Sequence, residues 1–98
     1  MTNEKELRQV SDIFSALGSP TRLKIIELVR KTERPLHIKA VAQVLKKDYA
    51  AVYRHIGVLE KCGLVGVYEV GRSRVLYLKN GELIEECVRT VKKMLSTR

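Results

Sequence analysis

The spacing of the apolar residues changes at Gly63, and this change restricts the folds that the chain can adopt. Before Gly63 the apolar residues recur at steps of three and four, as on one face of a helix. After it, residues 64–70 and 74–79 are rich in Val, Leu and Tyr. The turn-forming residues 71–73 separate these two segments, which predicts a β-hairpin. The sequence therefore predicts a mostly helical (α+β) domain that carries one hairpin.

Start and stop signals divide the remaining chain into five helices. Asn3, Ser19 and Asp48 are suited to cap helix N-termini, and Gly18 and Gly63 are suited to end helices. The segment between the second and third helices, residues 32–35, is expected to be a loop. The predicted helices span residues 4–17, 20–31, 38–45, 49–62 and 82–96.

The third and fourth predicted helices are joined by the short polar turn Lys46-Lys47, and the hairpin follows directly. Two short helices with such a turn, followed by a hairpin, have the plan of a winged helix-turn-helix domain. The predicted order is four helices, two strands and a final helix.

Three separated segments resemble the ArsR-type winged helix-turn-helix repressors. Residues 16–29 (ALGSPTRLKIIELV) are similar to the opening of those proteins, and residues 52–65 (VYRHIGVLEKCGLV) to their recognition helix and wing entry. Gly71-Arg72 and the following VLY segment at 75–77 fit their wing. The resemblance covers about residues 12–79.

The resemblance implies a single DNA-binding domain over residues 1–98 that forms a homodimer. Its dimerisation helices would be 1–18 and 82–98, its helix-turn-helix 36–62 and its wing 64–79. The fourth helix would enter the major groove of double-stranded DNA, and the wings would reach the flanking phosphates.

The charge of the chain agrees with an anionic partner. The formal net charge is +8, and residues 46–79 alone carry a net +4. With Val52, Ile56 and Leu59 facing inward, the pitch of the fourth helix turns its opposite face outward. A solvated surface role, or packing of Tyr53 on a neighbour, is the alternative to DNA contact. The predicted DNA-binding residues are Lys46, Lys47, Tyr49, Ala50, Tyr53, Arg54, Arg72 and Arg74.

The first and last helices carry more apolar surface than one small core needs. The resemblance implies that these helices pair across a two-fold axis, whereas the alternative is that both stripes pack within their own subunit. The predicted dimer-interface residues are Leu7, Val10, Phe14, Ile84, Cys87, Val88, Val91, Met94 and Leu95.

No metal ion or other cofactor is predicted. The third helix lacks the Cys-x-Cys motif that many ArsR relatives carry, and His37, His55, Cys62 and Cys87 lack metal-ligand spacing. His55 and Arg22 match positions of the family that we interpret as structural, with the Arg22 guanidinium bound to a carboxylate or carbonyl. A thiol switch is the alternative to a packing role for the cysteines, and no small-molecule effector is identified.

Catalysis finds no support, since the chain has no Gly-rich phosphate loop and no nucleophile motif. Its apolar runs are short and its first residues lack a secretion-signal pattern, so a cytoplasmic location is expected.

We therefore predict a non-enzymatic, sequence-specific transcriptional regulator that binds an inverted-repeat operator as a dimer. The resemblance to ArsR-type proteins implies that it is a repressor. The alternatives are a winged-helix module that binds another protein and a weakly selective architectural DNA-binding protein.

Overall fold

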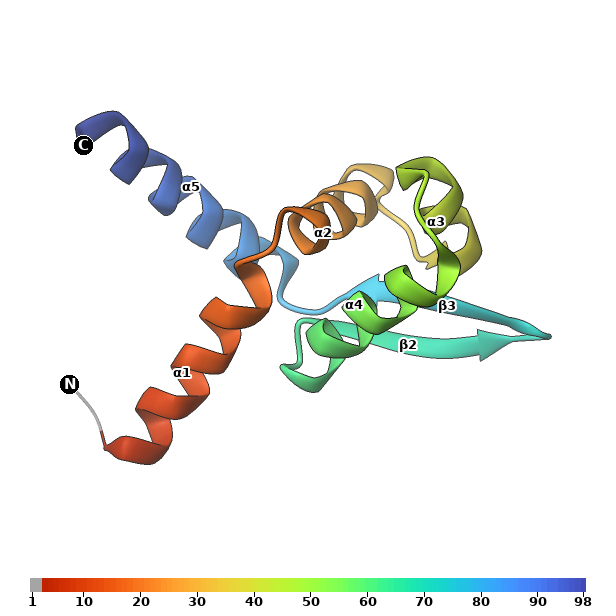
Figure 1. Cartoon of the computed structure of the whole chain (residues 1–98), viewed down its shortest axis with the longest axis horizontal. Coiled ribbons are helices and arrows are strands. Elements are labelled where there is room, and N and C mark those ends of the chain that lie inside the picture. Colours follow the sequence, from red (N-terminus) through yellow and green to blue (C-terminus); the bar gives the residue numbers. More distant parts are fainter. Residues whose placement is uncertain (1–2) are drawn as a thin grey trace.

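The computed structural model describes residues 3–98, which form five helices and a three-stranded antiparallel sheet (Figure 1). The predicted mostly helical winged helix-turn-helix fold is confirmed. The elements are α1 (Glu4–Leu17), α2 (Pro20–Thr32), β1 (Leu36–His37), α3 (Ile38–Leu45), α4 (Tyr49–Lys61), β2 (Val65–Val70), β3 (Ser73–Leu78) and α5 (Gly81–Thr97).

The helix boundaries arise from the capping residues that the sequence singled out. The side chains of Asn3, Ser19 and Asp48 each accept a hydrogen bond from the backbone N–H three residues later, at 2.8, 3.3 and 3.2 Å. Such bonds satisfy donors that the first helical turn leaves unpaired. Gly63 follows α4 with φ +75°, a left-handed conformation that glycine adopts without strain.

The sheet contains one strand that the sequence did not predict. Leu36 and His37 form β1, which pairs antiparallel with Leu76 and Val75 of β3, so the strand order is β1-β3-β2. A two-residue strand has no periodicity of its own, and it forms because β3 offers a free edge. This short pairing fixes the start of α3 against the middle of β3.

The core lies where α2, α3 and α4 meet the inner face of the hairpin. Each of these elements contributes side chains with no exposed surface, whereas α1 contributes only Ala16 to the buried set. The fully buried residues include Ile25, Ile38, Val41, Val52, Ile56, Leu59, Val65 and Leu76.

The first and last helices extend away from this core. Figure 1 shows α1 and α5 leaving the body on the same side, opposite the tip of the hairpin. Between residues 3 and 98, no helix has both the length and the apolar character of a membrane span.

Candidate nucleic-acid interface

Helix α4 separates its side chains into an inner and an outer face. Val52, Ile56 and Leu59 are fully buried, as the spacing predicted. Tyr49 and Tyr53 keep 43% and 40% of their surface exposed on the opposite side, and Ala50 and Arg54 are exposed as well. The first two turns of α4 therefore offer an accessible surface of two phenol rings, a small residue and a guanidinium group.

An arginine of the hairpin lies on this surface. The Arg74 Cζ atom is 4.9 Å from the centre of the Tyr53 ring, a cation–π arrangement, and Arg74 Nη1 donates a hydrogen bond to the Tyr53 hydroxyl. The Tyr49 and Tyr53 rings are stacked, with centroids 6.2 Å apart and an angle of 25° between their planes. Sequence reasoning placed these three residues in one interface but missed the contacts that join the hairpin to α4.

The remaining predicted DNA-binding residues flank this surface. Lys46 has a left-handed backbone (φ 55°) and ends α3, and Lys47 leads from it toward the cap of α4. Arg72 lies in the hairpin turn beside Gly71, whose φ is +61°. All eight predicted residues are exposed, and their contact with DNA stays a prediction.

Arg22 connects three helices behind this surface. Its Nε donates to the Ala16 carbonyl at 2.6 Å and its Nη2 to the Ser15 carbonyl at 3.3 Å, both in the last turn of α1. Arg22 Nη1 lies 3.0 Å from His55 Nδ1 on α4. The prediction that Arg22 binds a carbonyl is confirmed.

The surroundings of His55 favour its neutral form. Burial lowers the pKa of His55 below its usual 6.5, and the nearby charges of Arg22, Arg54 and Lys47 lower it further. A neutral imidazole accepts a hydrogen bond at Nδ1 from the Arg22 guanidinium, whereas a protonated one has no free acceptor. The contact that joins α2 to α4 therefore depends on an uncharged His55.

The predicted dimer residues divide into two groups. The apolar side chains of α1 and of the second half of α5 are exposed, with Phe14 at 60% and Met94 at 61%. Ile84, by contrast, is only 4% exposed and belongs to the protomer's own core, against which Val88 also packs. The prediction that Ile84 lies in a dimer interface is therefore wrong, because its side chain is already covered within the protomer. Exposed members of the first group are Leu7, Val10, Phe14, Val91, Met94 and Leu95.

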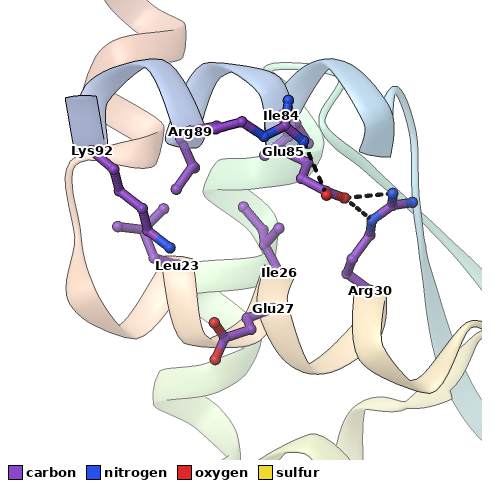
Figure 2. A pocket seen from close by; sticks show the side chains of 9 residues that line it. Leu23, Ile26, Glu27, Arg30, Ile84, Glu85, Arg89 and Lys92 are labelled. Atoms are coloured by element: carbon purple, nitrogen blue, oxygen red, sulfur yellow. Dashed lines mark hydrogen bonds and ion pairs between the residues drawn. The ribbon is translucent and has the colours of Figure 1, made fainter.

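A groove of about 500 Å³ runs between α2 and the first half of α5 (Figure 2). Leu23 and Ile26 of α2 and Ile84 and Val88 of α5 form its apolar lining. Charged side chains surround this lining: Glu27, Arg30, Glu85, Arg89 and Lys92.

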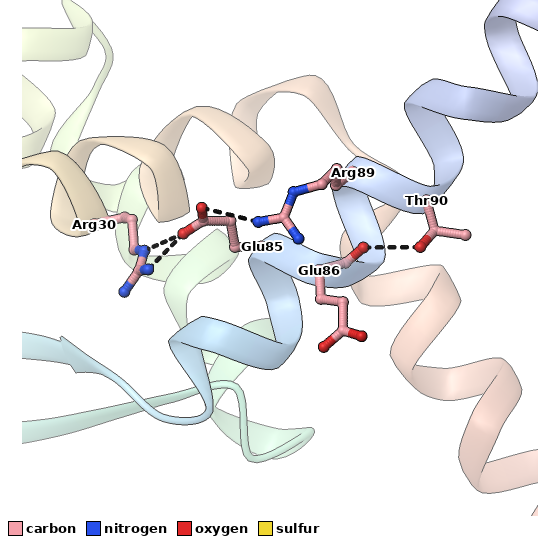
Figure 3. A network of polar contacts seen from close by, with 5 residues as sticks. All are labelled: Arg30, Glu85, Glu86, Arg89 and Thr90. Atoms are coloured by element: carbon pink, nitrogen blue, oxygen red, sulfur yellow. Dashed lines mark hydrogen bonds and ion pairs between the residues drawn. The ribbon is translucent and has the colours of Figure 1, made fainter.

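A polar network at the groove holds α5 against α2 (Figure 3). Arg30 donates from Nε to Glu85 Oε2 at 2.6 Å, and Arg89 Nη2 lies 3.2 Å from Glu85 Oε1. The hydrogen bond and charge of Arg30, with a smaller contribution from Arg89, lower the pKa of the Glu85 carboxyl. All three side chains are half-exposed, so the network orients α5 more than it stabilises the fold.

The cysteines and histidines lie apart from any metal-like cluster. Within the described residues 3–98, no three side chains of His, Cys, Asp or Glu are grouped as metal ligands would be. Cys62 Sγ contacts the Asp12 carbonyl oxygen at 3.6 Å, and Cys87 is half-buried. Both thiols are free, and the absence of a metal or redox sensor stays a prediction.

Comparison with known proteins identifies relatives of the whole domain. Residues 17–84 match the family model described as HVO_A0114. The HTH-type transcriptional regulator YuzN of Bacillus subtilis is 37% identical over 76 residues, which cover 72% of this chain and 83% of YuzN. An HTH-type transcriptional regulator of Methanocaldococcus jannaschii is 26% identical over 90 residues, covering 92% of this chain and 99% of that protein.

The fold is shared with a solved winged helix-turn-helix domain. The homodimeric DNA-binding domain of Mb0332 from Mycobacterium bovis, a possible ArsR-family transcriptional regulator, superposes with a TM-score of 0.82. The match covers 100% of this chain and 94% of that domain at 18% sequence identity. The similarity in fold includes α1 and α5, the two helices that extend from the body of the present structure.

Proposed function

The chain belongs to the HVO_A0114 family, and we propose that it is an ArsR-type repressor that binds an inverted-repeat operator in double-stranded DNA as a homodimer. It is a helix-turn-helix transcriptional regulator and not an enzyme, as its relatives are regulators. Regulation requires no chemical step: occupancy of the operator excludes the transcription machinery.

One observation carries the proposal: α4 turns Tyr53 and Arg54 outward beside a basic hairpin. The first turns of a recognition helix are the part that reaches base edges in the major groove. A guanidinium such as that of Arg54 binds guanine O6 and N7 with two hydrogen bonds, and the small Ala50 lets the helix approach closely or contact a thymine methyl group. Lys46, Lys47 and Arg72 are exposed, and we expect their charges to neutralise DNA phosphates.

The dimer is supported by the exposed apolar surfaces of α1 and α5. Large apolar side chains of a small protein seldom remain in solvent together unless another surface covers them. The fold relative Mb0332 is described as homodimeric. A two-fold dimer repeats α4 about 34 Å away along the same DNA face, which is the reason an inverted repeat is the proposed operator. Because its target is the chromosome, we place the protein in the cytoplasm.

A binding selection tests the function. The full chain is used to enrich sites from a duplex library that is randomised over about two helical turns, and affinities are then measured by fluorescence anisotropy. A dedicated regulator is expected to prefer the enriched inverted repeat over genomic competitor by about 10³-fold or more. A ratio near one indicates an architectural coating protein, and no binding at low salt indicates a protein-binding module.

A pair of arginine variants serves as the control. Arg54→Ala should weaken binding to the enriched inverted repeat by roughly 30-fold to 10⁴-fold, because each of the two half-sites loses one bidentate base contact of about 1–3 kcal/mol. Arg98→Ala removes the same charge at the far end of α5, where the residue is exposed, and should leave the affinity within about two-fold. A reporter promoter that overlaps the enriched site then distinguishes repression from activation.

A further inference from the structure

The two arginines of the hairpin have different surroundings. Arg72 lies in the turn between β2 and β3, where its side chain is exposed at the tip. Arg74 lies one step inside the strand, opposite Glu69, and its guanidinium covers the Tyr53 ring of α4. A phosphate-binding role suits the first position because the charge projects into solvent, whereas the second charge is already engaged by an aromatic ring.

The hydrogen bond from Arg74 leaves the phenol proton of Tyr53 available to another partner. A tyrosine hydroxyl has one proton to donate and lone pairs that accept. Arg74 Nη1 occupies an accepting site of the Tyr53 hydroxyl, so the hydroxyl is left to donate its own proton to a different partner. Arginine has no acceptor atom, and therefore the proton is not directed at the Arg74 guanidinium.

Stacking on Tyr49 adds a second restraint on the same ring. The two rings lie 6.2 Å apart at an angle of 25°, one helical turn apart on α4. With Tyr49 along the helix and Arg74 across from the hairpin, the Tyr53 ring is held from two directions while 40% of the residue stays exposed. A restrained side chain loses less conformational entropy on binding and discriminates better between partners.

We propose that Arg74 is a specificity-determining positioning residue, which holds Tyr53 so that its hydroxyl donates a hydrogen bond to an acceptor on a base edge. The inference rests on the proposed DNA-binding function. In the major groove, guanine, adenine and thymine present an acceptor, whereas cytosine presents only the N4 amino donor. One position of each half-site should therefore exclude cytosine on the contacted strand, and this exclusion should depend on Arg74 as well as on Tyr53.

The test compares conservative variants on sites enriched from the randomised duplex library. Arg74→Lys keeps the positive charge but loses the planar fork, and Tyr53→Phe keeps the ring but loses the hydroxyl. Both are expected to lose about 5–100-fold of the discrimination against cytosine at one shared position, with the dependence of log K on log salt unchanged. Arg72→Ala should instead weaken all sequences alike and reduce the magnitude of that slope by about 1.8, since the dimer loses one phosphate contact from each protomer.

Two results would overturn the inference. One is an Arg74→Lys variant with the wild-type base preference, and the other is an Arg74→Ala variant that reduces the salt slope as Arg72→Ala does. The first result would show that base preference does not depend on the Arg74 guanidinium, and the second would make Arg74 a phosphate contact. Both would leave the proposed function intact. The proposed function itself fails separately, if the wild-type chain enriches no site at all. Circular dichroism of each variant confirms that the exposed substitutions leave the fold unchanged.

Discussion

Replacing Phe14 with alanine should dissociate the proposed dimer without unfolding the protomer. An aromatic side chain covers roughly 150–250 Å² when fully buried. Since Phe14 is 60% exposed on α1, about 90–150 Å² of it remains for a partner. At about 25 cal/mol per Å², and with the β-carbon retained, the loss is roughly 1.5–2.5 kcal/mol for each protomer. Two-fold symmetry doubles it to about 3–5 kcal/mol, so the dimer Kd should rise roughly 10²–10⁴-fold.

Sedimentation equilibrium over a range of concentrations measures this Kd directly. Val44→Ala is the matched control, because Val44 is 61% exposed as well but lies on α3, away from both terminal helices. It should leave the Kd within about two-fold, since surface substitutions away from a contact have small effects. A Phe14→Ala protein that associates as tightly as the wild type would refute the assignment of this helix to the interface.

Three further perturbations test other parts of the structure. Ile56→Ala removes a side chain with no exposed surface and should lower the free energy of unfolding by about 2–5 kcal/mol, measured in urea at fixed protein concentration. Folding lowers the pKa of His55, so the unfolded chain takes up a proton first as the pH falls below about 6.5. The free energy of unfolding should therefore decrease from there toward the folded-state pKa. His55→Gln keeps an acceptor for Arg22 and should flatten this part of the plot of stability against pH. If a dimer neutralises roughly 6–10 phosphates, its affinity for the enriched operator should fall about 10³–10⁵-fold between 50 and 200 mM salt. Fluorescence anisotropy measures this affinity, and an affinity that does not change with salt would contradict phosphate contact by the basic hairpin.

The elements that the sequence predicted are those with local signals. Three of the helices, α1, α2 and α4, begin at a capping residue whose side chain bonds to the backbone three residues later, and such signals span only a few positions. The hairpin was equally visible because a turn separates two β-rich segments. In contrast, β1 exists only through its pairing with β3, about 40 residues later, and no window of sequence contains both partners.

The sequence predicted that the residues of the candidate interface are exposed, but it did not predict the contacts between them. Helical pitch alone places Tyr53 and Arg54 on the outer face of α4 once Val52 and Ile56 are assigned to the core. The contact between Arg74 and Tyr53 needs more, because it depends on how the hairpin leans on α4 and on the register of β2 against β3. A shift of one residue in that register would turn Arg74 to the other face of the sheet.

The assignment of Ile84 shows what helical periodicity leaves open. A stripe at steps of three and four identifies one face of a helix, but it does not say which partner covers each turn. Along α5 the surroundings change: Ile84 packs in the protomer's own core, whereas Met94, nearly three turns later, is 61% exposed. The same holds for α1, where Ala16 is buried and Phe14 is exposed. Both helices leave the body on the same side, and in the proposed dimer we expect one two-fold contact to cover the two exposed stripes together.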